Sequence, residues 1–235
     1  MDRKKSAVTA ERYAKGMTFD EYVKFVGTPE NLRREGSMAP RKDWGGFLRE
    51  SYDHARLSDA QVGAVRWLVA QPNGPRKMLV LSEEWSSDCR RDIPMLARLA
   101  EAGGLELRIF PRDGQRTGRE PRANPADSPN ADIMNEFLNE KNGQTWQSIP
   151  VAVFYTKDVE YLYHYVEYPA IYHKDRVVGA IRAAKPGETP EQTADRGTRD
   201  FFALQASPFF HLWACAAVDE ILSALHERLV VGSLP

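Results

Sequence analysis

The stretch WSSDC at residues 85–89 stands between two segments of different character. The run MLVL at 78–81 before it is short and wholly apolar, which is typical of a buried parallel strand. Residues 87–102 after it have helical apolar spacing, and two glycines at 103–104 supply a stop signal. The sequence therefore predicts a strand, a tight turn and a helix, with WSSDC forming the turn.

Two reactive residue types begin the predicted helix three positions apart, Ser86 and Cys89. A dithiol redox site needs two sulfurs at this spacing: the helix dipole acidifies the first thiol, and the second resolves the mixed disulfide. Only the second sulfur is present here. Ser86 forms no disulfide, and its hydroxyl is nearly unionised at neutral pH without an activating base. A serine stands in the nucleophile's place, either in the natural chain or by deliberate replacement.

The following segments extend the pattern into an alternating α/β fold. Strand-like and helical stretches follow in the order strand, helix, strand, strand, at 105–110, 131–141, 148–155 and 160–167. The last two are separated by a connection short enough for a hairpin. A right-handed crossover makes the first two strands parallel and places Ser86 and Cys89 at the carboxyl edge of the sheet, where α/β folds build their sites.

These residues resemble the thioredoxin superfamily, and more narrowly bacterial members with a Trp-Cys-x-Asp-Cys turn. Trp85, Asp88 and Cys89 match that turn, the pair Ile149-Pro150 matches the Ile-Pro before the third core strand, and Ser86 departs from the pattern. The resemblance covers residues 77–166. It implies a thioredoxin-like α/β fold with a glutaredoxin-sized β-α-β-α-β-β core.

The resemblance also implies roles for the matching residues. Pro150 is expected in the cis form, a minority state for X-Pro bonds, opposite the turn, where Ile149 and Pro150 shape a substrate cleft. Cys89 is expected to be the less exposed sulfur and Trp85 to cover the turn. Asp88 is either a local base or an acidic residue favoured by the positive end of the helix dipole.

Outside the core, the chain is expected to be helical and to form a single domain with it. Residues 1–76 are predicted to be an N-terminal helical extension, 77–167 the thioredoxin-like core, and 168–235 a helical tail packed on that core. The extension has helical patterns at 18–26, 43–55 and 58–70, and the segment 36–41 is a plausible linker between them.

Composition and charge exclude several classes of partner. With 32 Lys+Arg against 33 Asp+Glu, the chain lacks the excess of positive charge that is typical of proteins that bind nucleic acid or an acidic membrane. The sequence also has no signal-like apolar region after its charged start, and we expect no membrane span and a cytoplasmic location. Two cysteines build neither a disulfide framework nor a zinc site; a Cys89–Cys215 bridge is the rarer alternative to a buried Cys215.

Two further groups of residues have a structural and a functional interpretation. The loop at 111–130 is Arg-rich and has two interpretations: a solvated insertion, or a lid over the turn that attracts anions. His164 and His173, with Glu167 and Asp175 nearby, fit no standard metal-ligand spacing. No metal, nicotinamide or flavin motif is apparent, so no cofactor is expected.

Three functions fit the turn. The first is thiol–disulfide exchange through Cys89, with a protein dithiol or disulfide or a small thiol as the partner; this is the activity we assign. The second is binding of a small thiol such as glutathione by Ser86, because a hydroxyl at a helix N-terminus can donate to a thiolate. The third is a thioredoxin-fold binding or assembly module without redox turnover, whose helical additions form the partner surface.

Overall fold

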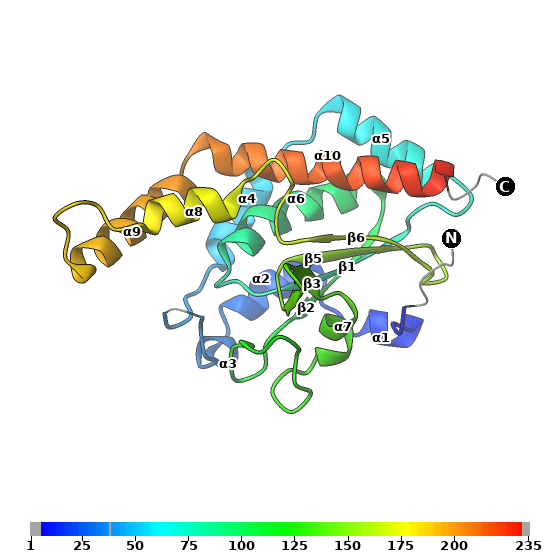
Figure 1. The fold of residues 1–235 in the computed structure, drawn as a ribbon. Helices are drawn as coiled ribbons and strands as arrows, with labels where there is room; N and C mark the ends of the chain where they lie inside the picture. The colour runs from blue at the N-terminus through cyan, green and yellow to red at the C-terminus, as the bar shows by residue number, and fades with distance from the viewer. Residues whose placement is uncertain (1–5, 38, 232–235) are drawn as a thin grey trace.

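A four-stranded mixed sheet forms the centre of the molecule in the computed structural model, which describes residues 6–37 and 39–231 (Figure 1). The strand order is β2-β1-β5-β6, with β1 parallel to β2 and antiparallel to β5. Their bounds are Lys77–Ser82 for β1, Glu106–Pro111 for β2, Val151–Tyr155 for β5 and Tyr161–Val166 for β6. This sheet confirms the predicted thioredoxin-like fold class.

The helix α6, Ser87–Gly103, connects the two parallel strands as predicted. Ser86 is its N-cap, and Gly104 ends it in the left-handed conformation with φ 64°, which glycine adopts at no steric cost. Pro94 lies inside the helix. The α6 helix is buried over most of its length because α4, α5 and α10 pack against it (Figure 1).

Where the structure describes it, at 6–37 and 39–76, the N-terminal extension contains the helices α1 Ala10–Ala14, α2 Phe19–Val26, α3 Pro29–Leu32, α4 Gly45–His54 and α5 Asp59–Ala70. Capping boxes begin α2 at Thr18 and α5 at Ser58, as their sequence signals predict. Met17 forms an antiparallel bridge with Ile109 and so covers the outer edge of β2. The extension therefore contacts both the helical layer and the sheet.

The C-terminal tail contains α8 Lys174–Arg182, α9 Pro190–Gln205 and α10 Pro208–Val231. The α8–α9 pair projects beyond the sheet, whereas α10 lies along α6, α5 and β6 (Figure 1). Within the described ranges, α10 is the one helix whose length and composition would suffice to cross a membrane. Its buried residues include Ile221 and Leu225, which belong to this protein's own hydrophobic core, and Trp213, which stacks on Tyr172.

The prediction of a helix at 131–141 is wrong for the second half of that range. The helix α7 covers only Ala131–Glu136, and the chain then forms a hairpin of β3, Asn139–Lys141, and β4, Gln144–Trp146. The two turn residues, Asn142 and Gly143, both have positive φ. Asn-Gly is the preferred pair for a two-residue hairpin turn, so this dipeptide reverses a strand and does not follow a longer helix.

Candidate functional site

The predicted site residues come from two segments that meet at one edge of the sheet. The turn at 85–89 follows β1, and the Ile149–Pro150 bond, which is cis as expected, precedes β5. Leu81 pairs with Val151 in the sheet register, so the turn and the proline leave neighbouring strands at the same edge.

Ser86 acts as the helix N-cap and has little free surface. Its Oγ accepts a hydrogen bond from the backbone N–H of Cys89 at 3.4 Å, and 7% of the residue is exposed. An N-cap oxygen used in this way satisfies one of the unpaired donors of the first helical turn. Ser86 therefore has an evident structural role in the place where the resemblance puts a nucleophile.

Cys89 is the buried sulfur of the turn, with 1% of its surface exposed. Burial raises the pKa of its thiol to about 12, although hydrogen bonds with the Glu83 backbone and with the hydroxyls of Ser82 and Ser86 act in the opposite direction. The Tyr22 hydroxyl lies 2.9 Å from Ser82 Oγ, and both residues are buried. At neutral pH the sulfur is a neutral thiol, which is a poor nucleophile.

Asp88 lies in the first turn of α6 between two cations. Its carboxylate accepts hydrogen bonds from Arg91 at 2.6 Å and from Lys174 at 2.7 Å. Arg91 also pairs with Asp92, and Lys174 with Glu167. Sequence reasoning missed this network because Lys174 comes from beyond the predicted core and Glu167 is the last residue of that core. Only the clustered charges at 88–92 signalled it.

Two other segments of the protein lie against the cis proline and the residues before it. Glu167 N–H donates to the Pro150 carbonyl at 2.8 Å, and Asn139 on β3 donates to Ser148 Oγ at 3.2 Å. Both Ile149 and Pro150 are buried. The cleft that the resemblance implies is therefore narrowed by the hairpin β3–β4 and by the segment after β6.

A second buried network lies behind the turn. It contains three acids and three arginines, all with side chains that are nearly or fully buried: Glu83, Glu84, Asp113, Arg34, Arg41 and Arg112. Arg41 donates to Glu83 at 2.6 Å and to Glu84 at 2.9 Å. Trp85 joins the cluster by donating from Nε1 to Asp113 at 3.1 Å. Two consecutive glutamates after a buried strand were the available sequence signal.

The Arg-rich loop is held against the N-terminal extension. Glu35 N–H donates to the Gln115 carbonyl at 2.9 Å, and Arg119 pairs with the Glu35 carboxylate at 2.7 Å. Arg112 is buried against Asp113. Arg41, the last residue of the predicted linker at 36–41, lies in the network behind the turn. An anion-binding role for the loop stays a prediction.

The two cysteines are unpaired, so the Cys89–Cys215 bridge does not form. Cys215 is half-buried on α10, with Sγ 3.6 Å from His211 Nε2. Within residues 6–37 and 39–231, no cluster of three or more His, Cys, Asp or Glu side chains could hold a metal ion.

A family model described as Thioredoxin matches residues 46–124, which include the turn, α6 and β2. This part of the chain is similar to thioredoxins. A crystal structure of a protein of unknown function from Pseudomonas aeruginosa, PA1234, superimposes with a TM-score of 0.51 at 15% identity and covers 93% of this chain and 98% of that one. An HIV epitope-scaffold superimposes with a TM-score of 0.51 at 16% identity, covering 94% of this chain and 98% of that one. No curated protein sequence matches. At these identities the two structural likenesses show a shared fold.

Proposed function

We propose that this protein with a thioredoxin-like fold is a binding module that performs no thiol–disulfide turnover. The observation that carries the proposal is the state of Cys89, which is 1% exposed with a pKa raised to about 12. At pH 7 a thiol with such a pKa is ionised in about one molecule in 10⁵. With Ser86 in the nucleophile's place, the turn holds no second sulfur.

The surroundings of the turn support the same proposal. A substrate that approached Asp88 would have to displace Lys174, and one that approached the Pro150 carbonyl would have to displace Glu167 N–H. Both groups belong to the C-terminal segment after β6. The additions that distinguish this chain from a minimal thioredoxin core thus occupy the edge where redox relatives receive their substrates.

The C-terminal helices supply the surface for a protein partner. Phe202, Phe209 and Leu212 are each more than half exposed, within eleven residues of one another on α9 and α10. Exposed aromatic residues are typical anchors of protein interfaces. The proposal expects Phe202→Ser/Phe209→Ser to lose a stoichiometric partner without a change in its unfolding midpoint. Retention of the partner by this variant would place the surface elsewhere.

The redox side of the proposal is tested by reduction of insulin disulfides with dithiothreitol as the reductant. The wild-type protein, Ser86→Cys and Cys89→Ser are compared beside a dithiol thioredoxin as the positive control. The proposal expects all three variants to match the uncatalysed rate. Turnover by the wild-type protein that is lost in Cys89→Ser would overturn it.

Thiol–disulfide exchange is the second candidate, and the retained turn, cis proline and hydrogen bonds to the Cys89 sulfur favour it. Strong activity in Ser86→Cys alone would support this candidate, with a protein disulfide or a small thiol as the partner. Saturable glutathione binding that is lost in Ser86→Ala would instead support a small-thiol site. Either result would replace the binding-module proposal.

A further inference from the structure

An open cleft of about 500 Å³ lies among the helices, away from the turn at 85–89. Its walls come from the link between α4 and α5, from α5 itself and from the C-terminal half of α6. Arg98 follows Cys89 by nine residues, which corresponds to about 13 Å along a helix axis. The cleft is therefore separate from the candidate site described above.

One wall of the cleft carries a balanced ion pair. Arg98 donates to Glu101 Oε2 at 2.8 Å, and its guanidinium group lies 3.7 Å from the centre of the Tyr52 ring. The Tyr52 hydroxyl also donates to Glu101 at 2.9 Å. These contacts hold Arg98 and Glu101 in place and leave them without net charge.

The other two cations of the cleft are uncompensated. Arg56 and Arg66 form no ion pair with any acidic group in the described ranges, and their hydrogen bonds go to main-chain carbonyls. Arg66 uses only its Nε, toward Ala102 at 3.4 Å, so both of its terminal nitrogens remain available. The cleft therefore carries two positive charges with free donors.

The rest of the lining is apolar and comes from Leu57, Val62 and Ala102 among others. A guanidinium group binds phosphate oxygens through parallel N–H donors, and two such groups match the charge of a phosphate monoester, which is close to −2 at neutral pH. A volume of about 500 Å³ is within the range of small-molecule sites. The lining thus combines a place for a dianionic head with a place for a small apolar body.

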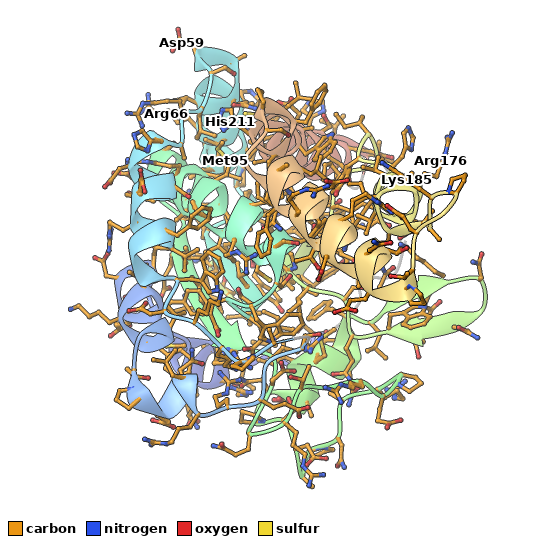
Figure 2. The ribbon with its side chains drawn as sticks, turned by 90° about the vertical axis from the view of Figure 1, so that its left-hand side faces the viewer. Asp59, Arg66, Met95, Arg176, Lys185 and His211 are labelled. Carbon is orange, nitrogen blue, oxygen red and sulfur yellow. The ribbon has the colours of Figure 1, made fainter. Side chains whose placement is uncertain are left out.

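We propose that this cleft binds a small organic phosphate monoester, with Arg56 and Arg66 holding the phosphate and the apolar wall contacting the organic group. The site is independent of Cys89 and of the outcome of the insulin assay. Figure 2 labels Arg66 on α5 and Arg176 on the opposite side of the same view. Arg176 is an exposed arginine on α8, outside the cleft, and provides a matched control.

The test is calorimetric titration at low ionic strength with phenyl phosphate, with phenol and inorganic phosphate as comparison probes. The wild-type protein is expected to bind one phenyl phosphate, at least tenfold more tightly than either comparison probe. Arg66→Gln and Arg56→Gln should each weaken this binding at least tenfold, while Arg176→Gln changes it less than twofold. Both glutamine variants are checked for an unchanged unfolding midpoint. One folded variant is enough to test the proposal.

Three results would overturn the proposal. They are no saturable binding of phenyl phosphate to the wild-type protein, equal weakening by Arg176→Gln, and phenol binding as tight as phenyl phosphate. Phosphatidic acid presents the same headgroup chemistry on a membrane. Flotation of the wild-type protein with phosphatidylcholine vesicles containing phosphatidic acid, without phenyl phosphate binding, would overturn the assignment of a soluble ligand.

Discussion

Lys174 Nζ lies 2.7 Å from Asp88 Oδ2 and 2.5 Å from Glu167 Oε1, so one ammonium group joins the first turn of α6 to the segment after β6. Burial acts to lower the pKa of Lys174, but the two carboxylates outweigh it and raise that pKa above its ordinary value. The ammonium group therefore stays charged through neutral pH. It links the C-terminal tail to the first turn of α6, beside the candidate site.

Replacing this lysine should destabilise the protein. Lys174→Met leaves Asp88 and Glu167 without a shared cation, and we expect a loss of about 2 kcal/mol in the free energy of unfolding; the loss stays below that of a fully buried pair because Arg91 still faces Asp88. Urea denaturation at pH 7.5 measures it. The control Lys157→Met removes an exposed pair with Asp158 and should cost less than about 0.5 kcal/mol. Equal losses in the two variants would contradict the prediction.

The two thiols should differ sharply in reactivity. Cys215 is half-buried, whereas the pKa of Cys89 is raised to about 12 by burial. With an excess of a disulfide reagent at pH 8, native protein is expected to label only at Cys215, and Cys89 should react about a thousandfold more slowly than in urea, since its thiolate fraction falls by about that factor. Cys215→Ser should abolish native labelling. Rapid labelling of that variant would show that the turn opens to solvent.

The same pKa gives stability a defined pH dependence. The Cys89 thiol has a pKa of about 12 in the fold and about 9 as a free group, so the folded state retains a proton that the unfolded chain loses between these values. The contribution of this thiol is therefore complete below pH 9 and declines as the pH rises toward 12. The slope approaches about 1.4 kcal/mol per pH unit from this one group. Cys89→Ser should remove that part of the slope, and an identical slope in both proteins would refute the assignment.

The turn, α6 and the core strands could be predicted from the sequence because their signals are local. The N-cap at Ser86, the stop at Gly104 and the apolar run of β1 each act within a few residues. The resemblance supplied the cis bond before Pro150, which no local pattern determines. Where two local signals competed, at the Asn142-Gly143 turn, the prediction favoured the helix and missed a hairpin.

The closure of the site could not be predicted in this way. Lys174 and Asp88 are 86 positions apart, and Arg41 and Glu83 are 42 positions apart. In sequence, each is one charged residue among many that would usually be solvated. Only the fold brings them together in a buried place, where a charge without a partner is costly. The chemistry of the turn therefore depends on residues that the resemblance does not cover.

The projecting α8–α9 pair should lose one stabilising contact only in strong acid. Hydrogen bonds from Arg196 and from the Lys185 backbone N–H lower the pKa of Glu188 to about 2, from 4.5 for a free glutamate. A lowered pKa means that the ionised carboxylate stabilises the fold above pH 4.5, and that this contribution is lost as the pH falls toward 2. The Lys185 amide resonance should titrate with a midpoint near pH 2, and the titration should be absent in Glu188→Gln. A midpoint near 4.5 would mean that the contact does not persist in solution.

The network behind the turn should depend most on Arg41. Its side chain is fully buried and faces Glu83, Glu84 and Asp113. In Arg41→Met, only Arg34 and Arg112 remain to pair with the three carboxylates. We expect the free energy of unfolding to fall by about 3–5 kcal/mol at pH 7.5. The exposed control Arg119→Met breaks a pair with Glu35 and should cost less than about 1 kcal/mol.

The pH dependence of that loss distinguishes a missing charge from a missing side chain. Burial already raises the pKa of Glu83, and removal of Arg41 should raise it further in the folded variant. The folded variant then takes up a proton that the unfolded chain lacks above pH 4.5, so its stability falls as the pH rises from that value. The difference in unfolding free energy between wild type and Arg41→Met should therefore be smaller at pH 5 than at pH 7.5. A difference that does not change with pH would mean that Arg41 acts through packing alone, and the carboxylates behind the turn would need no cation to stay buried.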